Sequence, residues 1–461
     1  MTQIQADHVP AAAMLASFAH CLQWPDDALH RFSVTGTDSL PSIFPVSDFA
    51  TATIGAAALS LSRLMANGGH APQVNVDRRL ASLWFNLTIQ PIGWQLPSLW
   101  EPIAGDYQGS NGWIRLHTNA PHHRMAALAV LQCPATREDV ARAVASWDIH
   151  ALEAAIVDNG GCAAVMRSLS DWAKHPQGIA IQNQPLIAFH SYTGATTQWR
   201  PSPLRPLEGL KVLDLTRVLA GPIATRWMAG YGADVLRVDP PHWDEGAVIP
   251  EVTPGKRCIR LDLTKSADRQ TFETLLASAD VLVHGYRADA LEHLGYGEAR
   301  RRQIRPALID VSLNAYGWSG PWQHRRGFDS LVQMSTGIAD AGMLAAHASQ
   351  PKPLPVQALD HGTGYLMAAA VVRGMHALIH ENRAYSARLS LARTAAFLIQ
   401  CPRQTDALPM AALNPDDIAA PVERTFWGNA QRLHSPAIID GAPMAWDRPA
   451  GPLGTGAPHW L

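Results

Sequence analysis

Asp360 stands in the stretch LDHGTGYLMAAAVV, directly before an Ala-rich apolar run that contains Gly362 and Gly364. Asp is favoured at the N-terminal cap of a helix, and the partial positive charge at a helix N-terminus keeps a carboxylate ionised. A carboxylate is also a competent nucleophile and a good leaving group from an anhydride. Two interpretations therefore stay open, a structural cap and a nucleophile, and the stretch by itself favours the cap.

Two further side chains near such a carboxylate could take part in acid–base chemistry. His361 follows Asp360 directly, where it could act as a base or be a solvated or capping residue. Asp329 follows a Gly-Phe pair in RRGFDSL, a position that is also typical of a helix cap. The five cysteines lie far apart and HExxH is absent from the sequence, so we expect no metal site.

The elements that must position these residues begin at Pro206. The stretch PLEGLKVLDLTRVLAGPIATRWMAGYGADVLRVDPP predicts a strand, a tight turn, a helix and a second strand, as in nucleotide-binding folds. Its turn, Val218 to Pro222, keeps a single glycine and has proline at the expected first helical position. The G-x-G-x-x-G pattern of a dinucleotide cradle is therefore missing, although Asp239 ends the second strand where a ribose-binding acid would stand.

Three more β-rich runs follow, separated by helical stretches. They are Lys256–Thr264, Ala279–Tyr286 and Pro306–Gly317. Strands that alternate with helices predict βαβ units and a mostly parallel sheet, so the fold class is α/β with a Rossmann-like domain. Ligands of such sheets bind beyond the carboxyl ends of the strands.

The N-terminal half has a different pattern of residue types, which predicts a smaller α+β domain. Asp48 opens an Ala-rich helical stretch, and Asn-Gly within Asp106–Asn119 predicts a hairpin. The Asp48 and Asp360 stretches resemble each other as a faint internal repeat, each with an acid, an Ala-rich helix and a short alternating run. The Pro-rich stretch Gln198–Gly209 predicts the linker between the two halves.

Composition narrows the partners and the compartment. The 461 residues carry a formal net charge of −2, which disfavours nucleic acid as a partner. No uncharged apolar run approaches the roughly 18 residues of a membrane span, and the N-terminal stretch lacks the early basic residues of a signal peptide. An odd, scattered set of cysteines is typical of a reducing compartment, so we expect no membrane partner and a cytoplasmic protein.

From Leu207 onward the chain resembles the family III CoA-transferases, the group that includes formyl-CoA transferase, carnitine CoA-transferase and α-methylacyl-CoA racemase. Six motifs occur in the order of the family as far as Leu398, and a closing stretch, SPAIIDGAPMAWDRPAGPLG, follows them. The six are PLEGLKVLDLTRVLAGPIATRWMAGYGADVLRVDPP, KRCIRLDLT, ADVLVHGYRADALEHLGYG, SLNAYGWSGPW, RRGFDSLVQMSTG and LDHGTGYLMAAAVVRGMHAL.

The resemblance implies transfer of coenzyme A between carboxylic acids, with acyl-CoA and a carboxylate acceptor as substrates and no metal. It implies that Asp360 attacks the acyl-CoA carbonyl to give a mixed anhydride, that the thiolate returns to form an aspartyl thioester, and that the acceptor completes the exchange. Asp329 matches an acid of the formyl-CoA transferase branch. Gly362 and Gly364 become expected places for close approach of the thioester or for amides facing an oxyanion.

The resemblance also implies the positions of the CoA contacts. Tyr286 is placed to stack on adenine and Arg326 to pair with a phosphate. Lys265 and Arg287 are adjacent to positions where family members often carry a basic residue or an Asn. The expected contacts are Val218, Leu219, Ala220, Gly221, Leu261, Thr264, Gly285, Tyr286, Arg287 and Arg326.

Departures from the family keep two alternatives open. Phe328 stands where the racemase branch has a histidine base, which argues against abstraction of an α-proton as the main chemistry. The alternatives are an acyl-CoA racemase, isomerase or dehydratase-like enzyme on the same scaffold, and a CoA-binding relative without turnover. Asp48 has no βαβ unit attached to it, so we interpret it as a relic of the repeat.

The order of the parts is unusual for the family and suggests a partly duplicated, rearranged chain. The hairpin lies in the N-terminal half, whereas the family has it after the Asp helix. We therefore expect the helices at Asp48 and Asp360 to pack about a pseudo-two-fold axis, in a pseudo-symmetric monomer or a homodimer. The expected divisions are an extension at 1–40, a small half at 41–197, a linker at 198–209, a CoA-binding domain at 210–400 and a closing segment at 401–461.

Overall fold

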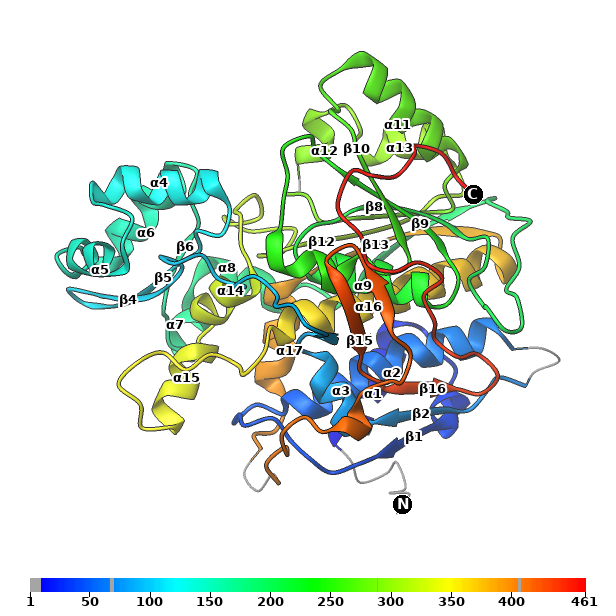
Figure 1. Cartoon of the computed structure of the whole chain (residues 1–461), viewed down its shortest axis with the longest axis horizontal. Helices are drawn as coiled ribbons and strands as arrows, with labels where there is room; N and C mark the ends of the chain where they lie inside the picture. The colour runs from blue at the N-terminus through cyan, green and yellow to red at the C-terminus, as the bar shows by residue number, and fades with distance from the viewer. Residues whose placement is uncertain (1–9, 67–69, 288, 405–407) are drawn as a thin grey trace.

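The computed structural model describes residues 10–66, 70–287, 289–404 and 408–461, so the first nine residues of the expected extension lie outside the described part. Within it, a seven-stranded sheet confirms the predicted α/β class (Figure 1). Six of its strands, β8 to β13, are parallel, and the seventh, β7, pairs antiparallel with β13. In sheet order the strands are β10 (Lys256–Arg260), β9 (Asp234–Asp239), β8 (Lys211–Leu215), β11 (Val281–His284), β12 (Ile309–Asn314), β13 (Arg383–Ser390) and β7 (Ala188–Thr193).

The order of the strands reverses direction next to β8. The chain runs from β8 through β9 to β10 on one side, then returns to β11 and continues through β12 to β13 on the other. A crevice forms at such a switch point, outside the carboxyl ends of the strands. In this sheet the switch point lies between β8 and β11, and five of the strands around it are the runs predicted from the sequence.

Side chains that alternate along β8 face two different helical layers. Val212 faces the layer of α9 (Ala220–Gly230) and α16 (Ala358–His380). Leu213 and Leu215 face the opposite layer, with Phe272 of α11 (Ser266–Ser278). Period-two alternation on a sheet buried on both faces accounts for the apolar character of these runs.

Helix α2 (Val46–Leu64) of the N-terminal half packs along α16, as Figure 1 shows near the centre of the molecule. A Cβ on Gly362 would lie 2.2 Å from Cε1 of Phe49, so the two helices approach each other closely at this point. The predicted contact between the helices of Asp48 and Asp360 is therefore present within one chain. Around α2 lie α1 (Pro10–Cys21), α3 (Arg78–Trp84) and a small sheet of β1 (Phe32–Thr35), β2 (Val74–Asp77) and β16 (Ala437–Ile439).

The two Asp helices begin with the same backbone geometry. Pro45, before α2, has φ −77° and ψ 63°, and Gln357, before α16, has φ −75° and ψ 62°. Each helix is followed by a strand and a second helix: β2 and α3 after α2, and β13 and α17 (Leu391–Gln400) after α16. The duplication stays a prediction, and these shared features support it.

A subdomain with its own core lies at the cyan end of Figure 1. The predicted hairpin is its β4 (Gly105–Gly109) and β5 (Gly112–Leu116), and β6 (Ala163–Val165) completes the sheet. We call residues 103–165 the β4–β6 subdomain. Its helices are α4 (Pro121–Leu131), α5 (Arg137–Ala145) and α6 (Ile149–Asp158).

The closing segment crosses back to the N-terminal half. Strand β15 (Gly428–Arg432) pairs with β14 (Glu423–Thr425) and with β3 (Ile89–Pro91). Short helices complete the described part, and none of its helices has both the length and the apolar character of a membrane span. They are α7 (Leu169–Lys174), α8 (Pro176–Gln182), α10 (Ile249–Val252), α12 (Ala290–His293), α13 (Glu298–Ile304), α14 (Asp329–Ser335) and α15 (Ile338–Ala345).

Candidate functional site

A cavity of about 340 Å³ lies at the carboxyl ends of β8, β11, β12 and β13, where the strand order places a ligand crevice. Its walls come from the turns after these strands, from α16 and from the β4–β6 subdomain. The lining residues are His122, His123, Arg217, Val218, Leu219, Ala220, Trp243, Gly285, Tyr286, Arg287, Ala290, Leu313, Asn314, Ala315, Arg325, Arg326, Gly327, Phe328, Asp360 and Leu391.

Asp360 lines this cavity, yet it is not the helix cap that the stretch favoured. Helix α16 begins at Ala358 with Gln357 in the cap position, and no side chain there accepts a capping hydrogen bond. Asp360 is the third residue of the helix and is 8% exposed. The cap interpretation is wrong, because the helix begins two residues before Asp360. Asp360 therefore does not cap the helix and instead lines the cavity.

Asp329 supports the start of α16 from the neighbouring helix α14. Its Oδ2 accepts a hydrogen bond of 2.8 Å from the backbone N–H of Asp360, and its Oδ1 accepts one from Gln333. The cap position of α14 belongs to Phe328, so the capping interpretation of Asp329 is wrong as well. The Asp329 carboxylate instead satisfies a backbone donor in the first turn of α16, where such donors have no partner within the helix.

The two carboxyl groups influence each other's ionisation. Burial raises the pKa of Asp329, while its hydrogen bonds from the Asp360 backbone and from Gln333 oppose the rise. Burial also raises the pKa of Asp360 well above its usual range, and the negative charge of Asp329 raises it further. The negative charge of Asp329 therefore opposes ionisation of Asp360, which retains its proton above the usual pH range of a carboxyl group.

The other predicted residues of this helix face away from the cavity. A Cβ on Gly364 would lie 2.4 Å from the carbonyl oxygen of Ala220, so glycine permits close packing of α16 on α9. Gly362 serves the contact with α2 in the same way. The ring of His361 stacks on Phe85 at 5.1 Å between centroids, and burial together with Arg226 lowers its pKa to about 3. Such an imidazole is neutral at physiological pH and a weak base.

The turn after β8 is held in an unusual backbone conformation. Val218 has φ +64°, a region that β-branched residues rarely occupy. Its N–H donates to Oε1 of Glu245 at 2.5 Å, and the indole N–H of Trp243 donates to the same oxygen at 2.8 Å. The loop after β9 thus fixes the turn that lines the cavity. Gly221 is buried beside Thr216, outside the lining.

Arg217 is a cavity residue that the sequence interpretation missed. Its guanidinium lies 4.6 Å from the ring centre of Trp243 and 5.0 Å from that of Tyr286, and it donates to the Tyr286 hydroxyl at 3.1 Å. An arginine held between two aromatic rings is poised to pair with an anion. Arg217 follows the end of the predicted first strand by two residues, and this position in the sequence could have identified it as a cavity residue.

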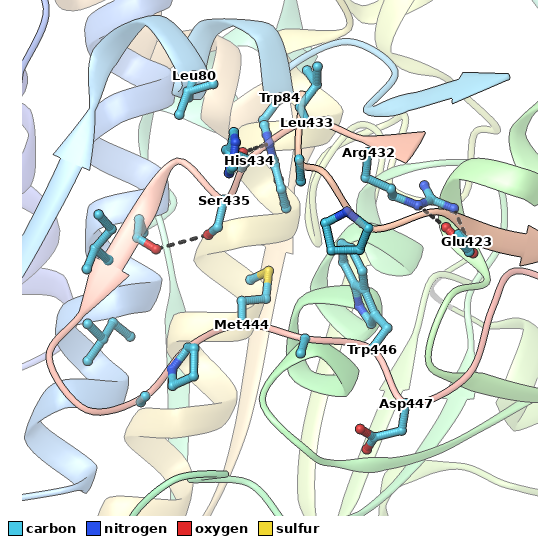
Figure 2. Close-up of a pocket in the computed structure, with 18 of the residues that line it drawn as sticks. Leu80, Trp84, Glu423, Arg432, Leu433, His434, Ser435, Met444, Trp446 and Asp447 are labelled. Carbon is cyan, nitrogen blue, oxygen red and sulfur yellow. Dashed lines mark hydrogen bonds and ion pairs between the residues drawn. The ribbon is translucent and has the colours of Figure 1, made fainter. Parts of the chain in front are cut away.

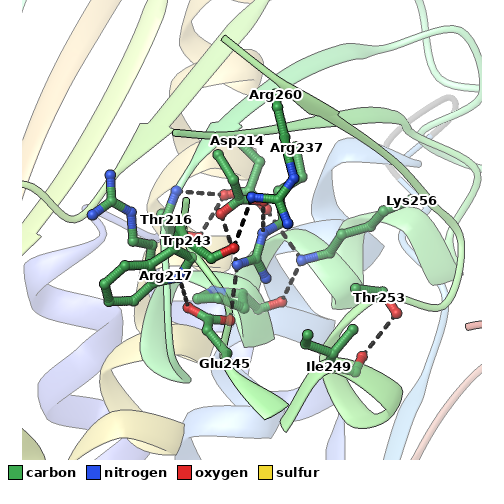
Figure 3. A network of polar contacts seen from close by, with 12 residues as sticks. Asp214, Thr216, Arg217, Arg237, Trp243, Glu245, Ile249, Thr253, Lys256 and Arg260 are labelled. Atoms are coloured by element: carbon green, nitrogen blue, oxygen red, sulfur yellow. Dashed lines mark hydrogen bonds and ion pairs between the residues drawn. The ribbon is translucent and has the colours of Figure 1, made fainter. Parts of the chain in front are cut away.

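Behind the turn lies the buried polar network of Figure 3. Lys256 pairs with Asp214 at 3.1 Å, and Arg237 pairs with Asp239 at 2.9 Å and with Glu245 at 2.8 Å. Asp239 is fully buried and already paired with Arg237, so it is not free to bind the ribose of a dinucleotide. The absence of a glycine cradle and the engagement of this acid point away from a nicotinamide cofactor.

The structure brings most of the predicted CoA contacts together. Arg326, one of them, also donates to the carbonyl oxygen of Gly160 at 3.1 Å. Leu261 lies in the core beneath α11, and the hydroxyl of Thr264 donates to Asp262 at 2.6 Å, so both lie outside the cavity. The predicted contacts that line the cavity are Val218, Leu219, Ala220, Gly285, Tyr286, Arg287 and Arg326.

The β4–β6 subdomain supplies one wall of the cavity. Phe328 stacks on His117 at 3.7 Å between ring centroids and contacts His123 edge to face at 5.8 Å. His122 and His123 open α4 and line the cavity. The sequence interpretation gave these two histidines no role, because their distance along the chain from Asp360 hid their proximity.

A larger cavity, about 1010 Å³, lies between α3 and the closing segment (Figure 2). Trp84, Met444 and Trp446 form part of its apolar lining, and the Trp84 indole donates to the carbonyl oxygen of His434 at 2.7 Å. None of the residues predicted to bind CoA or to react lines it. We place the candidate site in the smaller cavity, because it lies at the carboxyl ends of the sheet strands and is lined by Asp360 and by seven of the predicted CoA contacts. The described residues contain no cluster of His, Cys, Asp and Glu that could hold a metal.

Comparison with known proteins identifies the segment that supplies most of the cavity lining. Residues 207–423 match the sequence profile described as CoA-transferase family III. These residues belong to CoA-transferase family III. The family predicted from the sequence motifs is thereby confirmed for this segment, which includes Asp329, Asp360 and the turns after β8 and β11.

Individual relatives cover part of the chain only. A probable fatty acyl-CoA transferase of Mycobacterium tuberculosis is 32% identical over 196 residues, which are 40% of this chain and 48% of that protein. An acetyl-coenzyme A transferase of Hypoxylon pulicicidum is 34% identical over 195 residues, 41% of this chain and 33% of its own length. A formyl-CoA:oxalate CoA-transferase of Streptomyces coelicolor is 28% identical over 215 residues, 43% of this chain and 50% of its own.

The chain thus spans about half or less of the length of these curated relatives. A crystal structure of the mycobacterial protein aligns with 43% of this chain and 57% of that chain, at 30% identity and a TM-score of 0.39. That score is too low to add to the assignment, which rests on the family III sequence match.

Proposed function

We propose that this protein transfers coenzyme A between carboxylic acids through a covalent intermediate on Asp360. The observation that carries the proposal is the position of Asp360 in one cavity with the turns after β8 and β11. Family III membership of residues 207–423 supports acyl-CoA as the donor. The nucleotide end of CoA is expected against Arg217 and Tyr286, with its thioester directed toward Asp360.

The reaction begins with attack of an Asp360 carboxylate oxygen on the thioester carbonyl. The C–S bond breaks, the thiolate leaves and a mixed anhydride forms. The thiolate then attacks the aspartyl carbonyl, which releases the donor acid and leaves CoA as an aspartyl thioester. The acceptor carboxylate attacks this thioester, which releases the CoA thiolate and gives a second anhydride. The thiolate then attacks the acceptor acyl carbonyl of that anhydride, which forms the new acyl-CoA and restores the Asp360 carboxylate.

Ionisation of Asp360 is the step that the protein makes difficult. A protonated carboxyl is a poor nucleophile, and burial and Asp329 raise the pKa of Asp360. Basic side chains in the cavity, among them Arg217, Arg287 and Arg326, would stabilise the CoA phosphates. Asp329 is therefore a positioning residue, since it holds the first turn of α16 through the Asp360 N–H.

The racemase-type alternative gains no support from the residues near Asp329. Phe328 occupies the position of the histidine base, and the neighbouring imidazoles have lowered pKa values, about 3 for His117 and about 4 for His123, mainly because of burial. Such groups are poor acceptors of an α-proton.

Trapping of the intermediate tests the proposal. The protein is mixed with hydroxylamine and a panel of acetyl-, formyl-, oxalyl- and succinyl-CoA, and its peptides are examined by mass spectrometry. We expect an aspartyl hydroxamate at Asp360 with at least one donor, and none in Asp360→Asn. Hydroxamate at another residue, or turnover that survives in Asp360→Asn, would overturn the covalent route.

A further inference from the structure

His123 is a buried polar residue in the cavity wall without a protein partner for one of its nitrogens. The residue is 3% exposed, and its Nδ1 has no hydrogen-bond partner among the described residues. Buried polar groups nearly always have such a partner. Since His123 lines the cavity, the missing partner points to a group that enters with the substrate.

His123 shares the cavity lining with Asp360 and contacts the segment that carries Asp329. Its ring contacts that of Phe328, and the residue after Phe328 is Asp329, which accepts the backbone N–H of Asp360. Arg217 and Tyr286 line the cavity at the carboxyl ends of β8 and β11. With the nucleotide bound against Arg217 and Tyr286, the lining shared by His123 and Asp360 remains for the reacting groups.

The charges around His123 favour an anion. Arg326 lies in the same lining, where Asp360 is the sole acid among the described residues, whereas the charge of Arg325 is paired with Glu153 at 3.0 Å. Burial, His122 and Arg326 lower the pKa of His123 to about 4, so its imidazole is neutral at physiological pH and keeps one N–H to donate. A neutral donor binds a carboxylate oxygen without taking up a proton.

We propose that the Nδ1–H of His123 donates a hydrogen bond to a carboxylate oxygen of the acceptor acid as that acid approaches Asp360. The inference rests on the proposed function and deepens it by naming the group that binds the small carboxylate. It makes the site composite, because the nucleophile belongs to the family III segment whereas the carboxylate contact belongs to the β4–β6 subdomain. His123 is then a specificity residue for the acceptor.

Two substitutions separate the hydrogen bond from the packing of the ring. His123→Phe keeps a ring against Phe328 and removes both nitrogens. His123→Asn places an amide N–H near the position of Nδ1 and restores the donor. His150, an exposed histidine on α6 of the same subdomain, gives matched controls as His150→Phe and His150→Asn.

Steady-state kinetics are measured with acyl-CoA and with oxalate, succinate or glutarate as acceptors. We expect His123→Phe to raise the KM for the carboxylate about 3- to 10-fold, the effect of one hydrogen bond. The Kd of CoA, measured by calorimetry, should stay unchanged, and His123→Asn should recover most of the loss. A wild-type KM for every carboxylate in folded His123→Phe would overturn the inference and leave the proposed function standing.

A second readout needs no turnover. Imidazole ¹⁵N signals are recorded for the full chain while the same carboxylates are added, and the His123 signals are identified by their loss in His123→Phe. We expect the Nδ1 resonance of His123 to shift, and the His150 resonances to stay in place.

The outcomes separate this inference from the proposed function. If His123 does not respond to any of the acids in a protein that transfers CoA, the inference is wrong and the proposed function stands. If His123 responds in a protein that forms no aspartyl intermediate, the proposed function fails alone. If His123→Phe does not fold, the wild-type titration decides, with His123→Asn identifying the signal.

Discussion

Oδ2 of Asp329 accepts the backbone N–H of Asp360 at 2.8 Å, so two buried carboxyl groups are joined through the main chain at the start of α16. The bond fixes the orientation of the helix start without using the Asp360 carboxylate itself. It also keeps a negative charge near that carboxylate, which raises the pKa of Asp360. Asp329 therefore influences both the position and the ionisation of Asp360, the proposed nucleophile.

Replacement of Asp329 should move the pH dependence of the reaction. Asp329→Asn removes the negative charge while its amide oxygen can still accept the Asp360 N–H, so the pKa of Asp360 falls. We expect hydroxamate formation at Asp360 to begin at a lower pH than in the wild type. The rate is measured against pH with one acyl-CoA, and Asp340→Asn on α15, outside the cavity, serves as control. An unshifted profile would show that Asp329 does not raise the pKa.

Asp360→Asn should remove activity and yet stabilise the fold at neutral and alkaline pH. The pKa of Asp360 is raised in the folded state, so its contribution to stability is present at low pH and is lost as the pH rises through that raised pKa. Asn has no charge to bury, and the free energy of unfolding should exceed that of the wild type by about 1–3 kcal/mol at pH 8. The difference should shrink toward pH 4. Denaturant unfolding at both pH values checks this, and a variant that is less stable at pH 8 contradicts it.

Asp48 should matter for stability and not for turnover. Its Oδ2 pairs with Nη2 of Arg78 at 2.9 Å in the buried first turn of α2, away from the lining of the cavity. Asp48→Asn weakens this pair and should cost about 1–3 kcal/mol of unfolding free energy. Hydroxamate labelling of Asp360 and the rate of transfer should stay close to wild type. Loss of labelling in a folded Asp48→Asn protein would give this residue a role in the reaction.

Gly364→Ala should disturb both the helix contact and the cavity. The added Cβ would meet the carbonyl oxygen of Ala220 at 2.4 Å, a backbone atom that cannot rotate away, in a turn that lines the cavity. We expect a loss of about 1–3 kcal/mol in stability from overpacking and weaker binding of CoA. Gly451→Ala, whose Cβ would meet nothing within 4 Å, is the matched control. Equal stability of the two variants would contradict the close packing of α16 on α9.

Arg217 and Arg326 should each contribute to CoA affinity. If they pair with phosphates, Arg217→Ala and Arg326→Ala each weaken binding by about 1–3 kcal/mol, most strongly at low salt. Calorimetry at two salt concentrations measures the effect. Arg300→Ala, on the exposed face of α13, is the control because Arg300 pairs with Glu273 outside the cavity. An unchanged Kd for either variant would remove that arginine from the site.

Five strands of the family III segment were predictable because each is an apolar run bounded by turn residues. The runs predicted before and after Val218 are β8 and β9, and the three that follow are β10, β11 and β12. The antiparallel edge strand β7 was missed, since none of its residues is fully buried, its exposure does not alternate, and it depends on β13 for its hydrogen bonds. A strand at the edge of a sheet carries a weak pattern of its own.

The candidate site was predictable only in part, for a related reason. Local residue types suggested the turn at Val218 and the acid at Asp360, but the same local rules wrongly made Asp360 and Asp329 helix caps. Cap positions depend on where the chain enters the helix, and that entry is set by contacts from other elements. No local rule joins Asp329 to the N–H of Asp360.

The sequence by itself determined the α/β class, the five strands from β8 to β12, the family of residues 207–423 and the acid at Asp360, because these follow from periodicity, turn chemistry and motifs carried by contiguous residues. Only the tertiary structure decided that α2 packs on α16, that Asp360 is buried beside the charge of Asp329, and that His123 lines the same cavity. Burial, pKa and unpartnered donors are properties of neighbours in space, and here those neighbours come from distant parts of the chain.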